Sequence, residues 1–370
     1  LKKQVTKGKW EVLNYYGYNP KTKEAFIQTT QNGSINKVIS KVNINSGKIE
    51  VISAKDGTNS ANFSKNFHYF IENSSSAAQP STYTLKDANG KSLRELRNNK
   101  AQLEKLQADN LPIKEFMTIP NEVGDQMNAY IMKPKNFDPT KKYPVFMYQY
   151  SGPGSQSVSN SWDQGNGFWF GHLVQKGYIV VCVDGRGTGN RGTEYKKVTY
   201  KQLGKYEIED QIAAAKWLGK QSYVDASRIG IFGWSFGGYM ASLALTKGAD
   251  VFKLGIAVAP VTNWRYYDSV YTERFMLTPQ ENPSGYDDNS PTTHAKLLKG
   301  KFLMIHGTAD DNVHLQNSLE LSKQLTNSRK TNFDQHFYAD KTHNLSDGTP
   351  NILRISLYTR INDFLKKELK

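Results

Sequence analysis

The chain has 370 residues, of which 38% are apolar, and its formal net charge is +14 at pH 7. A chain of this length suggests about two domains with enough apolar material for folded cores. Most of its basic residues are lysines spread along the sequence, which indicates a solvated surface, and we find no nucleic-acid-binding motif. No apolar run approaches the roughly 18 residues that a membrane span requires.

The cysteine content excludes two further classes of protein. A single cysteine, Cys182, permits neither a disulfide framework nor a cysteine-bound zinc site. It lies in the apolar run 178–184, so we expect a small buried side chain there. The sequence begins with Leu1 rather than Met, and we interpret it as a processed chain or an excised fragment.

Residues 1–111 are typical of short strands joined by turns. Turn signals occur at Asn32-Gly33 and Asp56-Gly57, and residues 43–52 are typical of a hairpin. The predicted strands are 10–16, 25–29, 37–44 and 67–73. This rhythm indicates about one blade of a β-propeller, or slightly more. The polar stretch 91–110 predicts a connecting helix, followed by a domain boundary between residues 111 and 112.

From about residue 113 the pattern changes to alternating strands and helices. The predicted strands are 143–150, 178–184, 228–234, 253–259, 301–307 and 332–339, and the predicted helices are 207–220, 238–247, 317–328 and 352–369. This alternation predicts an α/β domain over residues 112–370, with a mostly parallel sheet covered by helices on both faces. Ligands of such sheets bind at the carboxyl ends of the strands.

The segment 233–238 has the sequence GWSFGG, which contains a G-x-S-x-G motif centred on Ser235. A predicted strand precedes it and a predicted helix follows it, which is the context of a nucleophile elbow. In such a tight turn, glycines two residues to either side of the serine leave space for the chain. The serine hydroxyl then stands above the sheet near a helix N-terminus, where developing negative charge is favoured.

A serine needs a general base, and in an elbow of this kind the acid and then the histidine follow it in sequence. Among the seven histidines, His343 lies after the last predicted strand and before the terminal helix, where the base is expected. A packed histidine is the preferred interpretation of His306, at the end of strand 301–307. The acid is expected in the loop after that strand, where spacing does not distinguish Asp310 from Asp311.

A second glycine motif, G-x-G-x-x-G at 187–192, also follows a predicted strand. A dinucleotide-binding fingerprint requires a helix directly after it, whereas residues 193–200 are β-branched and polar. We therefore interpret these glycines as turn residues, with Arg186 making local hydrogen bonds.

Several strings of the sequence resemble those of a known family. They are YSGP at 150–153, DGRG at 184–187, GWSFGGY at 233–239, AVAPVTNWRYYDSVYTER at 257–274 and HGTADDNVH at 306–314. The chain resembles the dipeptidyl peptidase IV branch of the prolyl oligopeptidase family, in a bacterial form. The resemblance spans nearly all of the second half, and residues 10–12 resemble the last propeller strands of that family. It implies an α/β-hydrolase fold preceded by the end of a propeller.

The resemblance also implies roles for particular residues. Ser235 would be the nucleophile, Asp310 the orienting acid and His343 the base, with an oxyanion hole formed by the Tyr150 hydroxyl and the Phe236 backbone N–H. A proline pocket would be walled by apolar and aromatic side chains, with one amide bonding a substrate carbonyl: Val261, Trp264, Tyr267, Tyr271, Val313 and Asn312. From the residues alone, core packing is the preferred interpretation of segment 264–271.

The implied activity is that of a serine peptidase that releases X-Pro dipeptides from peptide N-termini through an acyl-enzyme, with no metal or organic cofactor. Its implied setting is the periplasm or cell surface, and its implied assembly is a homodimer. The alternatives are a relative that releases acylated amino acids or tripeptides or acts as an endopeptidase, and a catalytically silent scaffold that binds peptides.

The sequence departs from the family pattern in three respects. Phe236 stands where tyrosine is usual, which preserves the backbone donor. The residues after His343 are less rich in glycine than the family pattern. The acidic pair that grips the substrate amino terminus belongs to earlier propeller blades, which these 370 residues do not include.

Overall fold

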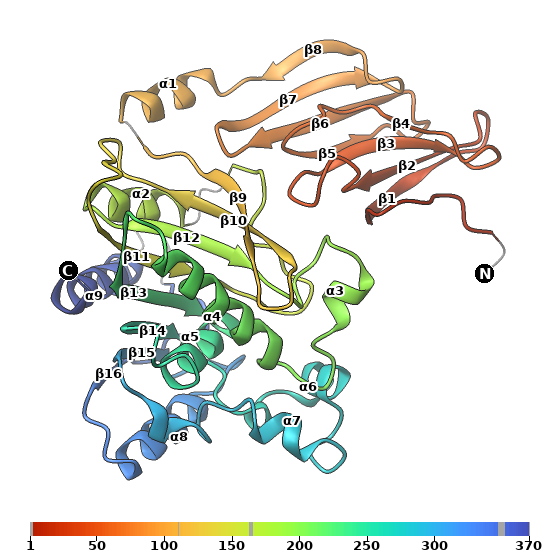
Figure 1. The fold of residues 1–370 in the computed structure, drawn as a ribbon. Helices are drawn as coiled ribbons and strands as arrows, with labels where there is room; N and C mark the ends of the chain where they lie inside the picture. The colour runs from red at the N-terminus through yellow and green to blue at the C-terminus, as the bar shows by residue number, and fades with distance from the viewer. Residues whose placement is uncertain (1–2, 110, 163–165, 347–351, 370) are drawn as a thin grey trace. The chain divides into compact units, whose positions relative to one another are not determined.

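The computed structural model describes residues 3–109, 111–162, 166–346 and 352–369 (Figure 1). Its contacts divide the chain into two compact units. The β unit comprises Leu1–Glu115, Val158–His172 and Gly189–Thr193, and the α/β unit comprises Phe116–Ser157, Leu173–Thr188 and Glu194–Lys370. The domain boundary between residues 111 and 112 stays a prediction.

The β unit contains two four-stranded antiparallel sheets whose strands pair in chain order. The first consists of β1 (Val12–Asn19), β2 (Glu24–Thr29), β3 (Val38–Asn43) and β4 (Ile49–Val51). The second consists of β5 (Thr58–Phe63), β6 (Tyr69–Ser76), β7 (Gln79–Asp87) and β8 (Ser92–Arg97). The blade-like architecture is confirmed, but two sheets are present where the sequence predicted about one blade.

The prediction of a helix over 91–110 was wrong in its first part. Strand β8 occupies Ser92–Arg97, and helix α1 covers only Lys100–Ala108. Every residue of β8 is exposed, and its sequence SLRELR shows no strict alternation of apolar and polar residues that would mark a strand. Its register with β7 holds it instead, through pairs such as Leu85 with Arg94. Asn110, also part of that prediction, lies outside the described residues.

A segment from the second half of the sequence completes the β unit. The Asn160 backbone N–H donates to the Ile35 carbonyl at 2.8 Å, and its side-chain amide donates to Asn36 Oδ1 at 3.0 Å. Asn160 Oδ1 accepts from the Ala77 N–H at 3.0 Å. One side chain thus satisfies polar groups in a connection of each four-stranded sheet, and this long-range role has no sequence signal.

The α/β unit is built on an eight-stranded sheet in the order β16-β15-β14-β13-β11-β12-β10-β9. Its strands are β9 (Glu115–Pro120), β10 (Gln126–Met132), β11 (Tyr143–Tyr148), β12 (Ile179–Asp184), β13 (Val224–Trp234), β14 (Leu254–Val258), β15 (Lys301–Gly307) and β16 (Phe333–Tyr338). From β12 through β16 neighbouring strands are parallel, whereas β10 runs antiparallel to β12. The predicted mostly parallel sheet is confirmed.

The strand order reverses at β11, because β12 and β13 lie on its two sides. In open parallel sheets, such a reversal opens a crevice at the carboxyl ends of the strands. Tyr150 follows the end of β11 and Ser235 follows the end of β13, so both emerge beside this crevice. Cys182, in β12, is fully buried as predicted.

The helices that follow α1 in the chain range from one turn to several. They are α2 (Gly167–Gln175), α3 (Thr193–Lys197), α4 (Lys205–Gly219), α5 (Phe236–Thr246), α6 (Ser269–Met276), α7 (Pro283–Asp287), α8 (Gln316–Asn327) and α9 (Ile352–Glu368), with 3-10 turns at Trp264–Tyr266 and Ala295–Leu297. Within the described residues, no helix has the length and apolar character needed to cross a membrane.

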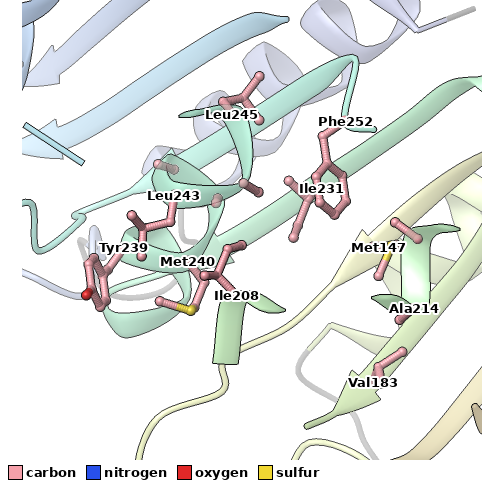
Figure 2. Close-up of a cluster of buried hydrophobic side chains, with 14 of the residues drawn as sticks. Met147, Val183, Ile208, Ala214, Ile231, Tyr239, Met240, Leu243, Leu245 and Phe252 are labelled. Carbon is pink, nitrogen blue, oxygen red and sulfur yellow. The ribbon is translucent and has the colours of Figure 1, made fainter. Parts of the chain in front are cut away.

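The main core lies between the sheet and helices α4 and α5, and all eleven residues of α5 are buried. Figure 2 shows side chains of this core from the strands and from both helices, among them Met147, Val183, Ile208, Ala214, Ile231, Tyr239, Met240 and Leu243. Gly230 alternates with Ile231 along β13 and faces Leu369, just after α9. Because successive strand residues point to opposite faces, α9 covers the face opposite α5. The helices therefore cover both faces, as predicted.

The second glycine motif lies in a turn, but two details of its interpretation were wrong. Helix α3 begins at Thr193, directly after the motif, although it is only five residues long. Arg186 bonds Asp210 of α4 rather than a local group, through Nε at 3.0 Å and Nη2 at 2.7 Å. This fork joins the turn after β12 to the buried face of α4.

Candidate active site

Ser235 occupies a strained turn between β13 and α5, with φ of 59° and ψ of −118°. Non-glycine residues keep such a conformation only where the surrounding structure enforces it. Here the Ser235 N–H donates to the Val258 carbonyl at 2.8 Å, and the Ser235 carbonyl accepts from the Tyr239 N–H at 3.0 Å. The neighbouring strand and the first turn of the helix thus hold the serine on either side.

Close backbone approach explains the glycines around Ser235. A Cβ atom at Gly237 would lie 2.6 Å from the Gln149 carbonyl oxygen, and one at Gly233 would overlap the backbone of Gly237. The Gln149 side-chain amide also donates to the Gly237 carbonyl at 2.8 Å. These contacts lock the end of β11 against the elbow, and any larger residue would push the two apart.

Tyr150, the residue after Gln149, hydrogen-bonds Ser235 through its hydroxyl. Burial raises the pKa of Tyr150, and the hydrogen bond with Ser235 opposes that rise only in part. The hydroxyl therefore stays protonated at neutral pH and can donate a hydrogen bond. Phe236 is the first residue of α5, and the first N–H groups of a helix have no partner within it. A hydroxyl and a backbone N–H thus both belong to the surroundings of the serine.

His343 and Asp310 are in direct contact, with 2.8 Å between His343 Nδ1 and Asp310 Oδ2. The other carboxylate oxygen accepts from the backbone N–H groups of Asn312 at 3.0 Å and Val313 at 2.9 Å. Burial alone would raise the pKa of Asp310, but hydrogen bonds from His306, His343 and the Val313 amide hold it well below its ordinary value. Asp310 is therefore ionised, and the geometry selects it over the exposed Asp311 as the partner of His343.

The loop that carries His343 is tied to the elbow. The Trp234 indole N–H donates to the His343 carbonyl at 3.1 Å, and Trp234 directly precedes Ser235. The Arg354 guanidinium of α9 stacks 4.6 Å from the Trp234 ring centroid. The structure thus brings the loops after β13, β15 and β16 together at one edge of the sheet. Residues 347 and 348, which belong to the segment after His343 that is less rich in glycine than the family pattern, lie outside the described residues.

The predicted pocket residues from the segment after β14 form an aromatic cluster. Trp264 stacks on Tyr271, with centroids 5.8 Å apart and an interplanar angle of 21°, and meets Tyr267 edge-on at 5.8 Å. Trp264 also packs 5.6 Å from Phe236, the residue after the serine. Trp264 is buried, whereas Tyr267 and Tyr271 are only partly covered, so the cluster has a packed base and an accessible rim. It combines core packing with an apolar surface beside the elbow.

Val261 and Val313 are buried in the same core as Trp264. Asn312 accepts a hydrogen bond from the Tyr267 hydroxyl at 2.6 Å, which links the loop after β15 to the aromatic rim. Tyr267 and Asn312 border a cavity of about 520 Å³, together with residues of both loops. Of the six predicted pocket residues, Tyr267 and Asn312 line this cavity, Val261, Trp264 and Val313 are buried, and Tyr271 lies on helix α6.

One contact of this site was not foreseen from the sequence. His306, at the end of β15, is fully buried as expected, but its Nε2 atom lies 3.1 Å from Asp310 Oδ2. The expectation of a packed histidine did not include a link to the acid. The four-residue separation of His306 and Asp310, across the end of a predicted strand, was the available signal.

Comparisons with known proteins agree with this geometry. Residues 168–370 match the model of the prolyl oligopeptidase family, and residues 1–81 match that of the dipeptidyl peptidase IV N-terminal region. A probable dipeptidyl-aminopeptidase B of Sclerotinia sclerotiorum is 37% identical over 368 residues, covering 98% of this chain and 39% of the relative.

Two solved bacterial structures have the same fold. Porphyromonas gingivalis dipeptidyl peptidase 4 has a TM-score of 0.94 at 45% identity, and a putative dipeptidyl aminopeptidase IV from Bacteroides ovatus has a TM-score of 0.91 at 33% identity. Each alignment covers 99% of this chain and 51% of the solved chain, so the chain spans about half the length of these proteins. The resemblance inferred from the sequence is confirmed: the chain belongs to the prolyl oligopeptidase family.

Proposed function

We propose that the chain carries the catalytic part of a serine dipeptidyl peptidase, which cleaves after proline at the second position of a peptide. The observation that carries the proposal is the 2.8 Å contact between His343 and Asp310, on a loop hydrogen-bonded to the residue before Ser235. A histidine polarised by a carboxylate, on a loop bonded to the elbow of a strained serine, fits nucleophilic acyl transfer.

The proposed reaction assigns one step to each side chain. Because the Asp310 carboxylate only accepts hydrogen bonds, His343 Nδ1 carries the proton and Nε2 is left as a base. Ser235 Oγ attacks the peptide carbonyl carbon while His343 takes its proton. His343 then protonates the leaving amine as the C–N bond breaks, leaving an acyl-enzyme on Ser235. A water molecule then attacks the acyl carbonyl carbon while His343 takes its proton. The ester bond to Ser235 Oγ breaks, His343 returns the proton to that oxygen, and the dipeptide leaves.

The Tyr150 hydroxyl and the Phe236 N–H would stabilise the oxyanion of each tetrahedral intermediate. Each such donor contributes on the order of 2.7–4 kcal/mol to the transition state when it is held in place beforehand. The position of Tyr150 supports this role. Its neighbour Gln149 donates a side-chain hydrogen bond to the Gly237 carbonyl, which holds this part of the backbone against the elbow.

Proline specificity is proposed from the aromatic rim. A flat apolar ring fits a slot walled by Tyr267 and Tyr271 over the packed Trp264. Burial raises the pKa values of both tyrosine hydroxyls, so the rim stays uncharged at neutral pH. Asn312, held by the Tyr267 hydroxyl, is the proposed donor to a substrate carbonyl.

The part of the active site that recognises the substrate amine is proposed to belong to propeller blades beyond these residues. A desolvated charge pair of that kind contributes roughly 2–5 kcal/mol, so we expect the isolated chain to be weak on dipeptide substrates. We further propose a periplasmic or cell-surface location and a homodimer. Light scattering of the purified protein tests the assembly, and cell fractionation tests the location.

The decisive experiment compares Gly-Pro, Ala-Ala-Pro and acetyl-Ala chromogenic substrates in this chain and in a longer protein that contains it. The proposal predicts the highest kcat/KM for Gly-Pro in the longer protein, with a marked loss in this chain. Preference for acetyl-Ala or Ala-Ala-Pro would indicate the acylaminoacyl or tripeptidyl alternative. No turnover of any substrate by a folded longer protein would indicate a peptide-binding scaffold.

A further inference from the structure

His306 makes three contacts in the core beneath the proposed triad. Its Nδ1 atom lies 2.7 Å from Ser318 Oγ, and its Nε2 atom lies 2.7 Å from the Val313 carbonyl oxygen and 3.1 Å from Asp310 Oδ2. The side chains of His306 and Asp310 are both fully buried. Every polar atom of this imidazole therefore has a partner, and two partners belong to the loop that carries the acid.

These partners determine where the proton of His306 lies. A backbone carbonyl and a carboxylate both only accept hydrogen bonds, so Nε2 must carry a hydrogen. The Ser318 hydroxyl can donate to Nδ1 when the imidazole is neutral and accept from it when the imidazole is charged. In either protonation state, the single Nε2 hydrogen of His306 is shared between the Val313 carbonyl oxygen at 2.7 Å and Asp310 Oδ2 at 3.1 Å.

The contact completes the hydrogen bonding of one carboxylate. Asp310 Oδ1 accepts from the amides of Asn312 and Val313, and Oδ2 accepts from His343 and His306. Four donors match the acceptor capacity of a carboxylate and leave it no freedom to rotate. Without His306, Asp310 Oδ2 would keep His343 as its one donor, and no buried group would hold this oxygen in its orientation.

We propose that His306 is a positioning residue that orients Asp310 toward His343 and, through the Val313 carbonyl, fixes the wall of the proposed proline pocket. This inference rests on the proposed function, because it assigns His306 a role in the same reaction. His306 touches no substrate and transfers no proton. Its imidazole couples the acid of the triad to a pocket residue three positions further along the loop.

The role has a consequence for the pH dependence of the reaction. A carboxylate shared between two imidazoles stabilises the His343 imidazolium less than one that serves His343 alone. The other charged or titratable side chains on the described segments next to this pair are Asp311 and His314 in the loop after β15, Lys341 two residues before His343, and Arg354, which stacks on Trp234. Tyr267 also lies nearby, and its pKa is raised by burial and in part by the charge of Asp310. His306→Leu alters none of these groups, so a difference in the acid limb between this variant and the parent chain reports on the contact between His306 and Asp310.

The test measures the rate of Ser235 labelling by a fluorophosphonate against pH in the 370-residue chain and its variants. In His306→Leu, the acid limb should move up by about 0.5–1 pH unit, because an ordinary hydrogen bond changes an equilibrium about 3- to 10-fold. The plateau rate should fall roughly 10- to 100-fold, because Asp310 is no longer held in place. In His306→Gln, whose amide can donate from the position of Nε2, the limb should return toward that of the parent chain.

Ser318→Ala is the matched control. It removes a buried hydrogen bond from the same imidazole but leaves the Nε2 hydrogen directed at Asp310 and Val313. Both variants should lower the melting temperature, whereas only His306→Leu should move the acid limb. Equal pH profiles for the two variants, after correction for the folded fraction, would overturn the proposal and leave His306 a structural residue.

A failure of the proposed function is distinguishable from a failure of this inference. If the folded parent chain does not label at Ser235, the function itself is wrong. If the chain labels but His306→Leu does not fold, nitrogen-15 NMR of the parent imidazoles decides. The proposal requires Nε2 of His306 to stay protonated across the titration of His343, and a deprotonated Nε2 would overturn it.

Discussion

The two units of this chain differ in how much core supports their strands. Among the described residues of the β unit the buried apolar clusters are small, for example Phe26, Ile39, Ile52 and Phe70 in one and Ala25, Ile27 and Val42 in another. Large side chains such as Tyr15 and Tyr69 are half exposed or more on its strands. In the α/β unit, one large cluster of buried apolar residues extends from Ile119 to Leu325, and further buried side chains such as Phe146 and Leu357 lie outside it.

The groups of the proposed reaction all belong to the unit with the larger core. Ser235, Asp310 and His343 lie on loops, but each loop begins at the end of a strand in a sheet covered on both faces. A rigid base of this kind holds catalytic side chains within the narrow geometry that acyl transfer requires. The contrast predicts that the chemistry belongs to the α/β unit.

The largest expected effect is the loss of the nucleophile. Ser235→Ala should reduce hydrolysis of an activated ester by the isolated chain to background, a fall on the order of 10⁴- to 10⁶-fold. Steady-state rates of the parent and the variant, with circular dichroism as a control for folding, make the comparison. Retention of most of the activity would place the chemistry outside this elbow.

A pair of core substitutions tests whether the two units support the activity unequally. Leu243→Ala in α5 and Ile39→Ala in β3 each remove a fully buried side chain and should destabilise their own unit by about 2–5 kcal/mol. Calorimetry would measure stability, and fluorophosphonate labelling during a temperature ramp would measure activity. Labelling should fail at lower temperature only in Leu243→Ala. Equal loss in Ile39→Ala would contradict the assignment of chemistry to one unit.

The next effect concerns the oxyanion. Tyr150→Phe removes the hydroxyl that bonds Ser235 and should lower kcat about 10²- to 10³-fold. Burial raises the pKa of Tyr150 above its ordinary value of about 10, so the hydroxyl donates throughout the neutral and mildly alkaline range. The parent rate should therefore show no Tyr150-dependent fall below pH 10. A fall that disappears in Tyr150→Phe would show that the hydroxyl ionises earlier.

The smallest expected effect is selective. Tyr267→Ala and Tyr271→Ala should lower kcat/KM for an X-Pro substrate of the longer protein about 10- to 200-fold, the range for lost apolar contacts in a pocket. A small active ester, which does not need the pocket, should be hydrolysed at close to the parent rate. Equal losses on both substrates would show that the tyrosines act as core residues alone.

Local signals made much of the α/β unit predictable. The periodicity of apolar residues indicates the alternation of strands and helices. Glycines mark the elbow at Ser235, because the close backbone contacts there leave no space for a side chain. His343 follows from the chain order of the fold. Spacing alone did not distinguish Asp310 from Asp311, because the distinction depends on a buried contact 33 residues along the chain.

Other features depend on contacts that no local pattern encodes. Strand β8 is exposed throughout, and its polar sequence is typical of a helix or loop. Only its pairing with β7, which no local pattern predicts, makes it a strand. Asn160 bonds a connection of each sheet of the β unit from a segment more than 80 residues away. His306 was expected to be a packed residue, since burial can be inferred from a strand pattern but a shared carboxylate cannot.

Mapping the site of fluorophosphonate attachment by mass spectrometry tests the central claim most directly. The claim is that the α/β unit of this chain assembles a reactive serine from loops after three different strands. The account predicts a single adduct, on Ser235, whose formation requires a folded chain and is lost in His343→Ala. An adduct on another serine, or a folded chain that forms none, would contradict it.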